Sequence, residues 1–502
     1  MRVSERRMVS GFGEVARAGW LRKAFVLTGL VGAGVALGGA GCGSSDCAFD
    51  ATCGTPSDAG SDADVTWPTG CTPGAEPSVD RECLSESIGY FVSSQGNDTV
   101  GDGKQGTPFR TVAKALESFS RQKHRIFICD GEYSGNLNID AAHTGLEIYG
   151  GFACGNWAYT GERSKIKAAD PNAPAAQWQG ATAGKIRDVE ISSGDATKDG
   201  ASSIAVFTSG STLDFARVKL IAGDGRKGAD GVLVPFDFVN PSTLNGASGV
   251  PLATGEGKSS TCQSGTPKST GGSGGGINGN GTKGIPDLGQ GAGGAGGGTC
   301  ALGGNGAAGG PGGPGEKVQI VGVLTAAGWA GASGKDGSHG SPGQGGGGGG
   351  GGAGGGGGGG GAGGCGGTGG PGGQAGGSSI GLASFDSRLT VADSELTTKS
   401  GQDAGAGVDG QAGQGAGGFG GDRGAGNACP GGAGGAGGKG GAGGGGAGGS
   451  TIGIVFSGPA PKLDAQTQQR ITNTGDAGDP GVGALSTNGG IKGVKQPIYQ
   501  LQ

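Results

Sequence analysis

Glycine constrains the fold of this chain more than any other residue. The 502 residues include 132 Gly, most of them in two tracts at about 225–377 and 401–449, and two uninterrupted runs of eight flank Ala353. Glycine loses the most backbone entropy on ordering and has no side chain to bury. The tracts are therefore either disordered surface loops or extended polyglycine-II-like strands, packed too closely for other residues. Collagen packs in this manner, but its strict Gly-X-Y period is missing.

A short apolar sequence recurs at Ser202, Ser378 and Ser450, on either side of the glycine tracts. Each copy is followed by a second apolar segment and then by a turn of Gly and Asp residues. The spacings between copies are unequal, which fits insertions at the surface and does not fit a repeat of the core. A strand-rich unit that occurs three times predicts a solenoid, whose coils bury their apolar faces by stacking on one another.

Residues 88–152 contain the clearest pattern of secondary structure. Val112, Ala115 and Leu116 have helical spacing and follow Thr111, a suitable entry residue. The apolar run 126–128 ends at a Gly/Asp turn, and two alternating segments, near 137–139 and 146–148, have the pattern of half-buried strands. A helix beside the first strands would cover the open end of a solenoid.

These segments also resemble a known family. The matching residues are Tyr90-Phe91-Val92-Ser93, Gly96-Asn97-Asp98, Pro108-Phe109-Arg110-Thr111, Cys129-Asp130-Gly131-Glu132-Tyr133 and Tyr149-Gly150-Gly151-Phe152-Ala153-Cys154. They resemble the head domain of bacterial right-handed parallel β-helix proteins of the pectin-lyase-like type. A β-helix coil interrupted by Gly-rich repeats is similar to the surface lipoproteins called the PGRS family. The resemblance implies an all-β, right-handed parallel β-helix with an N-terminal capping helix and long Gly-rich insertions. It does not imply an activity, because one fold hosts many functions.

The sequence predicts seven segments, from a signal peptide to a terminal coil. They are 1–41 (signal peptide), 42–87 (Ser/Asp/Pro-rich tether), 88–224 (parallel β-helix head), 225–377 (Gly-rich insertion), 378–400 (β-helix coil), 401–449 (Gly-rich insertion) and 450–502 (terminal coil and tail).

The N-terminal segment predicts export with a lipid anchor. A basic stretch precedes the apolar residues 24–40, which are too few for a comfortable membrane span. The sequence Gly39-Ala40-Gly41-Cys42 resembles a bacterial lipobox, which implies that Cys42 is lipidated and that the protein is anchored in the outer membrane. Gly39 departs from the usual Leu, so plain secretion with cleavage nearby is the alternative.

The eleven cysteines support an oxidising compartment. If Cys42 carries lipid, ten remain, an even number that suits disulfides. Cys129 and Cys154 end matching turns of neighbouring coils and are expected to pair. The remaining pairs are assigned by proximity alone: Cys47–Cys53, Cys71–Cys83, Cys262–Cys300 and Cys365–Cys429. A zinc site requires CxxC-type spacings, and none occurs in the sequence.

The charge excludes a nucleic-acid partner. Removal of residues 1–41 takes away six of the 36 basic and two of the 41 acidic residues, which leaves a net charge of −9. Such an acidic chain has no electrostatic footprint for nucleic acid. The partners expected instead are the membrane, through the lipid, and cell-surface polysaccharide or envelope proteins.

The sequence offers no catalytic motif. Cleavage of polysaccharides by this fold needs clustered carboxylates or a basic residue with calcium, and only Arg217-Val218-Lys219 matches a motif of the β-helix polygalacturonases. Asp98 and Asp102 are weak calcium candidates in a turn. No cofactor is implied.

Four aromatic residues are candidates for stacking on sugar rings: Trp157 and Tyr159, beside Cys154, and also Trp178 and Trp329. The alternative for each is packing within the fold. The sequence therefore predicts a non-enzymatic lipoprotein of the cell envelope with a structural or adhesive role. The alternatives are a carbohydrate-binding β-helix protein and, second, a polysaccharide lyase or hydrolase.

Overall fold

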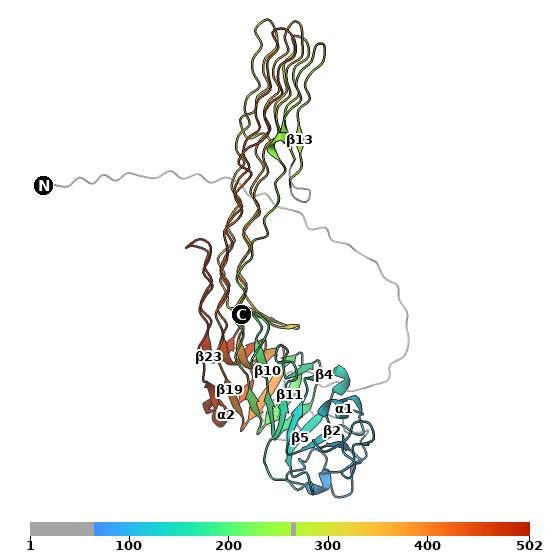
Figure 1. Ribbon diagram of the computed structural model, residues 1–502. Coiled ribbons are helices and arrows are strands. Elements are labelled where there is room, and N and C mark those ends of the chain that lie inside the picture. The colour runs from blue at the N-terminus through green and yellow to red at the C-terminus, as the bar shows by residue number, and fades with distance from the viewer. Residues whose placement is uncertain (1–64, 263–267, 502) are drawn as a thin grey trace, which may run out of the picture. The chain divides into compact units, whose positions relative to one another are not determined.

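The computed structural model describes residues 65–262 and 268–501, which belong to one compact unit (Figure 1). The predicted lipidation site Cys42 and the expected pair Cys47–Cys53 lie outside the described residues. Strands dominate the described part of the chain, and most of them lie in three parallel sheets. The prediction of an all-β protein is therefore confirmed at the level of its parallel sheets.

Three sheets contain the long-range strand pairs. Sheet 1 consists, in order, of β1 (Gly89–Val92), β2 (Arg125–Cys129), β5 (Glu147–Phe152), β8 (Gly184–Arg187), β11 (Thr212–Ala216), β18 (Arg388–Ala392) and β21 (Lys462–Leu463). Sheet 2 consists of β3 (Glu132–Ser134), β6 (Ser164–Lys167), β9 (Val189–Ser192), β12 (Lys219–Ile221), β19 (Glu395–Thr398) and β22 (Ile471–Asn473). Sheet 3 consists of β4 (Leu137–Asp140), β7 (Ala176–Gln179), β10 (Ser203–Ser209), β17 (Ser379–Phe385), β20 (Thr451–Ser457) and β23 (Lys495–Gln500).

From β2 onward the chain visits sheets 1, 2 and 3 in turn and then returns to sheet 1. Both glycine tracts leave the sheets at the same corner, between sheet 2 and sheet 3: the first lies between β12 and β17, and the second between β19 and β20. Two short hairpins belong to the first tract. They are β13 (Ser259–Ser260) with β14 (Ser269–Thr270), and β15 (Gly322–Thr325) with β16 (Gly328–Gly331).

The three copies of the apolar repeat pair in register within sheet 3. Ile204 lies opposite Ile380, and Ile380 lies opposite Ile452. Parallel strands in register stack identical side chains, and each copy can bury its apolar residues only against the next. The predicted repeat therefore does align three segments that are far apart in the sequence.

The main core lies between the sheets and is covered at one end by helix α1 (Val112–Glu117). Thr111 caps this helix by accepting a hydrogen bond from the Lys114 N–H, and Val112, Ala115 and Leu116 are buried in the core, as the helical spacing predicts. The other helices are short: α2 (Ala465–Gln469) and the 3₁₀ helices η1 (Arg81–Cys83), η2 (Ala141–His143) and η3 (Pro241–Leu244).

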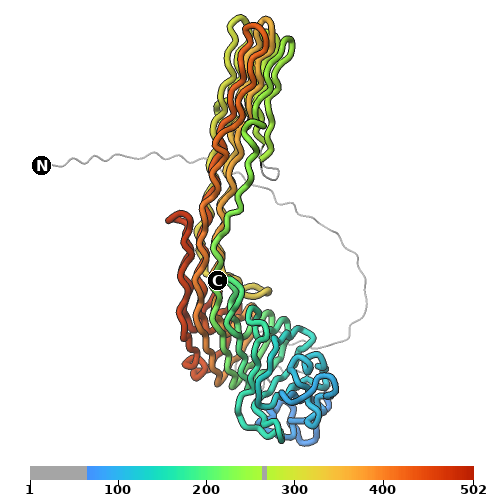
Figure 2. The backbone as a smooth tube through the Cα atoms, viewed as in Figure 1, coloured from blue at the N-terminus to red at the C-terminus, as the bar shows by residue number. Residues whose placement is uncertain are grey.

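The glycine tracts form a bundle of extended segments that run side by side (Figure 2). The run 345–352 is buried along its whole length, and its hydrogen bonds repeat with a period of three. Consecutive N–H groups donate to different neighbours: Gly346 to Gly361, Gly347 to Gly304 and Gly348 to Thr282. Three residues per turn is the period of polyproline II and collagen, so the structure matches the polyglycine-II-like alternative.

The run also accepts hydrogen bonds from three further segments. The carbonyls of 346, 347 and 348 accept from Gly272, Gly432 and Gly294. Each turn of the central run therefore contacts six neighbouring segments. A Cβ atom at 346, 347 or 348 would press on the backbone carbonyl of Gly432, Ala292 or Ser273, respectively. All three positions of the period face backbone, which explains the unbroken glycine.

Segments at the edge of the bundle need fewer glycines. In 303–315, Gly occupies every third position and donates to the segment 430–442, from Gly303 to Pro430 as far as Gly315 to Ala442. The intervening positions hold Ala, Asn and Pro as well as Gly, and a Cβ at Gly310 would meet nothing within 4 Å. The spacing of glycine along a segment therefore reflects which positions face the backbone of a neighbouring segment.

Residues 65–87 correct the prediction of a tether over 42–87. They contain η1 and the disulfide Cys71–Cys83, and Cys71, Cys83 and Ile88 form a small buried cluster with Trp67 packed against it. The composition of this segment predicted no core, but one disulfide and a few apolar residues suffice when the segment packs on a preformed sheet. Residues 42–64 lie outside the described part.

Two predicted disulfides are wrong. Cys129 pairs with Cys154 and Cys71 with Cys83, in agreement with the sequence, but Cys262 pairs with Cys365 and Cys300 with Cys429. Proximity in sequence failed because the bundle places segments side by side that are 103 and 129 residues apart. The latter two disulfides fasten different segments of the bundle to each other.

The apolar stretch 232–239 within the first tract belongs to no strand. It lies extended at the margin of the bundle, held by side-chain amides: the Gln411 Nε2 donates to the Phe236 carbonyl, and the Gln414 Nε2 donates to the Val239 carbonyl. No helix among the described residues is long and apolar enough to cross a membrane.

Candidate functional site

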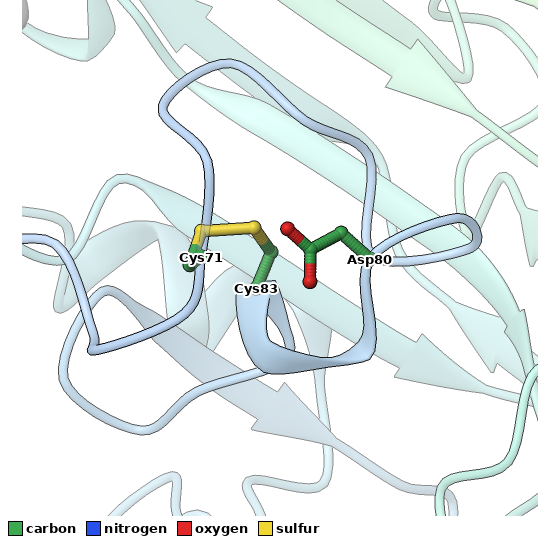
Figure 3. Close-up of side chains that lie close together, drawn as sticks. All are labelled: Cys71, Asp80 and Cys83. Atoms are coloured by element: carbon green, nitrogen blue, oxygen red, sulfur yellow. A yellow bond between two sulfur atoms is a disulfide. The ribbon is translucent and has the colours of Figure 1, made fainter.

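Only one group of side chains among the described residues has metal-like spacing, and its cysteines are not free. Cys71 and Cys83 form a disulfide, so their sulfurs are not available as thiolate ligands (Figure 3). The third member, Asp80, accepts hydrogen bonds from the Thr72 and Glu82 N–H groups, at 3.1 and 3.2 Å, and caps η1. The group stabilises the N-terminal segment.

The calcium candidates Asp98 and Asp102 are engaged in local structure. The Asp98 carboxylate accepts from the Arg110 and Thr111 N–H groups, at 2.7 and 3.1 Å, and fastens the loop to the start of α1. Asp102 is paired with Lys104, and this pair, together with a hydrogen bond from a threonine hydroxyl, lowers its pKa to about 2. Both carboxylates therefore hold local structure, and calcium binding by them stays a prediction.

The two principal aromatic candidates differ in exposure. Trp157 is only 5% exposed and packs edge-on against Phe91, so the prediction that it stacks on a sugar is wrong. Trp178, also a candidate, lies in the core. Tyr159 is 39% exposed, donates its hydroxyl hydrogen to Asp188 and lines a groove. Burial raises the pKa of its hydroxyl, and the Asp188 carboxylate adds to this.

This groove, about 550 Å³ in volume, lies on the outer face of sheet 2. A ladder of alternating charge crosses the sheet, because in-register residues of neighbouring strands carry opposite charges. Its members are Glu132, Lys165, Glu190, Lys219, Glu395 and, just before β22, Arg470. Opposite charges on adjacent parallel strands favour this register and disfavour a slip. The sequence did not reveal the ladder, because its members are widely separated and their order follows only from the strand pairing.

Two residues that line the groove, Arg217 and Asp188, belong to an ion-pair network that extends beyond it. Arg217 contacts Asp188 at 2.7 Å and Glu76 at 2.6 Å, while Arg187 contacts Glu76 at 2.6 Å and Asp214 at 2.6 Å. Burial alone would raise the pKa of Glu76, but its hydrogen bonds to the two arginines outweigh burial and lower it. Through Glu76, the network attaches the N-terminal segment to sheet 1 by ion pairs.

The same pairing argues against chemistry at Arg217 and Lys219, the sole motif match. The hydrogen bond to Asp188 and the contacts with Glu76 raise the pKa of Arg217, which opposes its use as a base. Lys219 pairs with Glu190 at 3.4 Å. A glycosidase acid needs a carboxyl whose pKa is raised. Every carboxyl with a shifted pKa in the described part, as in Glu76 and Glu147, is shifted downward.

A second ionic site is buried in sheet 1. Arg125 is fully buried, lies over the Tyr149 ring and contacts the Glu147 carboxylate at 2.7 Å. Lys185 approaches the same carboxylate at 2.7 Å. Burial by itself raises the pKa of Glu147, but Arg125 and Lys185 outweigh it and the pKa falls. A paired, charge-satisfied site of this kind serves structure.

Comparison of the chain with known protein families, characterised proteins and solved structures finds no match. The conclusions about function therefore rest on this chain's own residues.

Proposed function

We propose that this protein is a non-enzymatic lipoprotein of the bacterial cell envelope with a structural or adhesive role. Its sheets would form a right-handed parallel β-helix of the pectin-lyase-like type, with the glycine tracts as insertions, as in the PGRS family. The order in which the chain visits the three sheets supports this fold. Lipidation of Cys42 would anchor the protein in the outer membrane, and its partners would be surface polysaccharide or envelope proteins.

One observation carries the proposed role: the glycine tracts are a continuous lattice of backbone hydrogen bonds. The central run contacts six neighbours, and two disulfides join the surrounding segments. A glycine-rich chain loses much backbone entropy when it becomes ordered. The hydrogen bonds of the bundle must offset this loss, and a bundle held by so many bonds is rigid. Rigid projections suit spacing and adhesion, since a preorganised surface loses little entropy on binding.

Deletion of the bundle tests this role. Ala229 and Gln374 are hydrogen-bonded to each other, and so are Gly405 and Gly446, so short Gly-Gly linkers can replace 230–373 and 406–445. This removes both bundle disulfides whole and leaves no unpaired cysteine from them. Cells with the shortened protein should display it but lose attachment to surfaces or to other cells. Attachment equal to that of the full-length protein would overturn the proposal.

A control separates loss of function from loss of folding. The shortened protein must retain the disulfide Cys129–Cys154, which lies in the part that is kept. If this disulfide forms, the protein is displayed and attachment still fails, the deleted segments are responsible. They include the hairpin β15–β16 as well as the bundle, so full-length Trp329→Ala protein, which keeps the bundle, is compared. Normal attachment by that variant assigns the loss to the bundle. The alternative of a lyase or hydrolase gains no support from the groove, where Arg217 is paired with Asp188 and Lys219 with Glu190.

A further inference from the structure

A cavity of about 400 Å³ lies between the hairpin β15–β16 and the outer face of sheet 3, and it is separate from the charged groove on sheet 2. The hairpin covers a second hydrophobic cluster, in which Leu324 is buried and Trp329 is partly buried against the apolar residues of β10, β17 and β20. The hairpin thus closes over sheet 3 but leaves a space at its margin, beside β7 and β10.

One part of the cavity wall is apolar. Ile204 and Phe207 project outward from β10, because they belong to the outer cluster and not to the main core. Pro174 and the ring of Trp329 complete this part. An aromatic ring and flat aliphatic surfaces form a platform of the kind that packs against the C–H face of a ring-shaped ligand.

The other part of the wall is polar. Gln177 donates to the Asn138 side chain at 2.7 Å, and within the described residues its carbonyl oxygen has no recorded partner. The hydroxyl oxygens of Ser202 and Ser333 accept hydrogen bonds from backbone N–H groups, at 2.9 and 3.1 Å, so their hydrogens can still be donated. A ligand would find both an acceptor and donors here.

No charged side chain lines the cavity among the described residues, although the neighbouring groove is lined almost wholly by charged ones. A ligand with a phosphate or carboxylate would leave its charge unpaired in this space, at a high cost. A purely apolar ligand would leave the amide and hydroxyl groups unpaired. The cavity therefore selects a neutral molecule that has an apolar face and hydroxyl groups at its edge.

We infer that this cavity binds a neutral sugar ring at the end of a glycan, with the ring stacked on Trp329 and its hydroxyls bonded to Gln177, Ser202 and Ser333. The volume is within the range of small-molecule sites. The inference goes beyond the proposed role of the bundle, because no residue of the central run 345–352 lines the cavity. It supplies a binding surface to the protein even if the bundle is only a spacer.

The test is a printed glycan array, with oligosaccharides that end in neutral hexoses or N-acetylhexosamines and a matched set that ends in uronic or sialic acids. The probe is the disulfide-intact protein without residues 1–42. Binding to the neutral set is expected, and both Trp329→Ala and Gln177→Ala should weaken it at least about tenfold. Phe419→Ala is the matched control, since Phe419 is 74% exposed and outside the cavity.

The variants distinguish binding in the cavity from binding in the charged groove and from loss of folding. Because Trp329→Ala could loosen the hairpin, Gln177→Ala provides a second variant outside it, and the melting temperature of both is measured. A preference for acidic glycans that falls with Lys165→Ala would assign binding to the charged groove and overturn the inference. Absence of binding to any neutral glycan would also overturn it, and so would binding by both cavity variants that equals the binding of the natural protein. Because the deletion of 230–373 also removes the hairpin, the attachment of cells that display full-length Trp329→Ala and Gln177→Ala protein separates the two proposals. Normal attachment by both variants leaves attachment to the bundle, and its loss assigns attachment to the cavity.

Discussion

Gly348→Ala should damage the bundle far more than Gly310→Ala, although both substitutions add one methyl group. At Gly348 the Cβ would press on the Ser273 carbonyl and lie 2.7 Å from the Gly274 nitrogen. The segment must move by about 1 Å, which breaks the hydrogen bonds from Gly272 to 346 and from Gly275 to 349, both 2.8 Å long. Two lost hydrogen bonds cost about 2 kcal/mol, and overpacking adds about 1–3 kcal/mol.

The expected loss of unfolding free energy is therefore roughly 3–5 kcal/mol for Gly348→Ala. For Gly310→Ala, whose Cβ would meet nothing within 4 Å, the change should be at most about 1 kcal/mol and stabilising, because alanine lowers the entropy of the unfolded chain. Scanning calorimetry of the disulfide-intact protein measures both. Equal melting temperatures for the two variants would refute the claim that the central run is packed on all sides.

Three further changes test other parts of the account. Cys42→Ser should release the protein from the membrane fraction and abolish its labelling by fatty acid. Loss of the disulfide between Cys262 and Cys365, which closes 103 residues, should cost about 4–5 kcal/mol on the chain-entropy model. Glu147→Gln leaves the buried Arg125 charge without its carboxylate and should cost about 3–5 kcal/mol in urea unfolding.

Each of these predictions has a contradicting result. Membrane-bound Cys42→Ser protein would exclude the lipid anchor, and non-reduced peptides that join Cys262 to Cys300 would exclude the observed pairing. For the buried site, Glu132→Gln is the control, because the exposed pair of Glu132 with Lys167 should contribute at most about 1 kcal/mol. Equal losses of unfolding free energy for Glu147→Gln and Glu132→Gln would show that the buried pair stabilises the fold no more than the exposed pair does.

The buried pair also predicts a pH dependence. The folded-state pKa of Glu147 lies below its ordinary value of 4.5, so the ionised carboxylate stabilises the fold. This contribution is complete above the ordinary pKa and is lost as the pH falls through the lowered value. Urea midpoints measured between pH 6 and pH 2 should therefore fall more steeply for the natural protein than for Glu147→Gln. Parallel curves would contradict the assignment.

Local patterns in the sequence predicted the elements that are held by neighbours in the chain. The helix at Val112–Glu117 and the register of the repeat follow from periodicity, because apolar side chains at those spacings can be buried in only one way. For Trp157 the sequence left two alternatives, stacking on a sugar or packing within the fold, since its partner Phe91 lies on β1, far from it in the sequence. The predicted partners of Cys365 and Cys429 were wrong for a similar reason, because their true partners lie on segments that only the bundle brings together.

The glycine tracts themselves left two alternatives because composition does not distinguish order from disorder. The distinguishing signal is positional. Unbroken glycine occurs in the run 345–352, where every position of the period faces backbone. Gly at every third position occurs in 303–315, where a Cβ at Gly310 or Gly313 would meet no backbone within 4 Å. A disordered linker has no reason to divide its glycines in this manner, so a pattern of this kind can be sought in other glycine-rich chains.

The central claim is that the glycine tracts form one ordered, hydrogen-bonded bundle, and hydrogen exchange followed by mass spectrometry tests it most directly. The disulfide-intact protein without its leader is exchanged at neutral pH and compared with the urea-unfolded chain. The account predicts that the amides of 345–352 and 356–361 are protected as strongly as those of β10 and β17, and that the turn 353–355 and the exposed edge residues near 310 exchange sooner. Immediate exchange across 345–361, with protection confined to the three sheets, would contradict it.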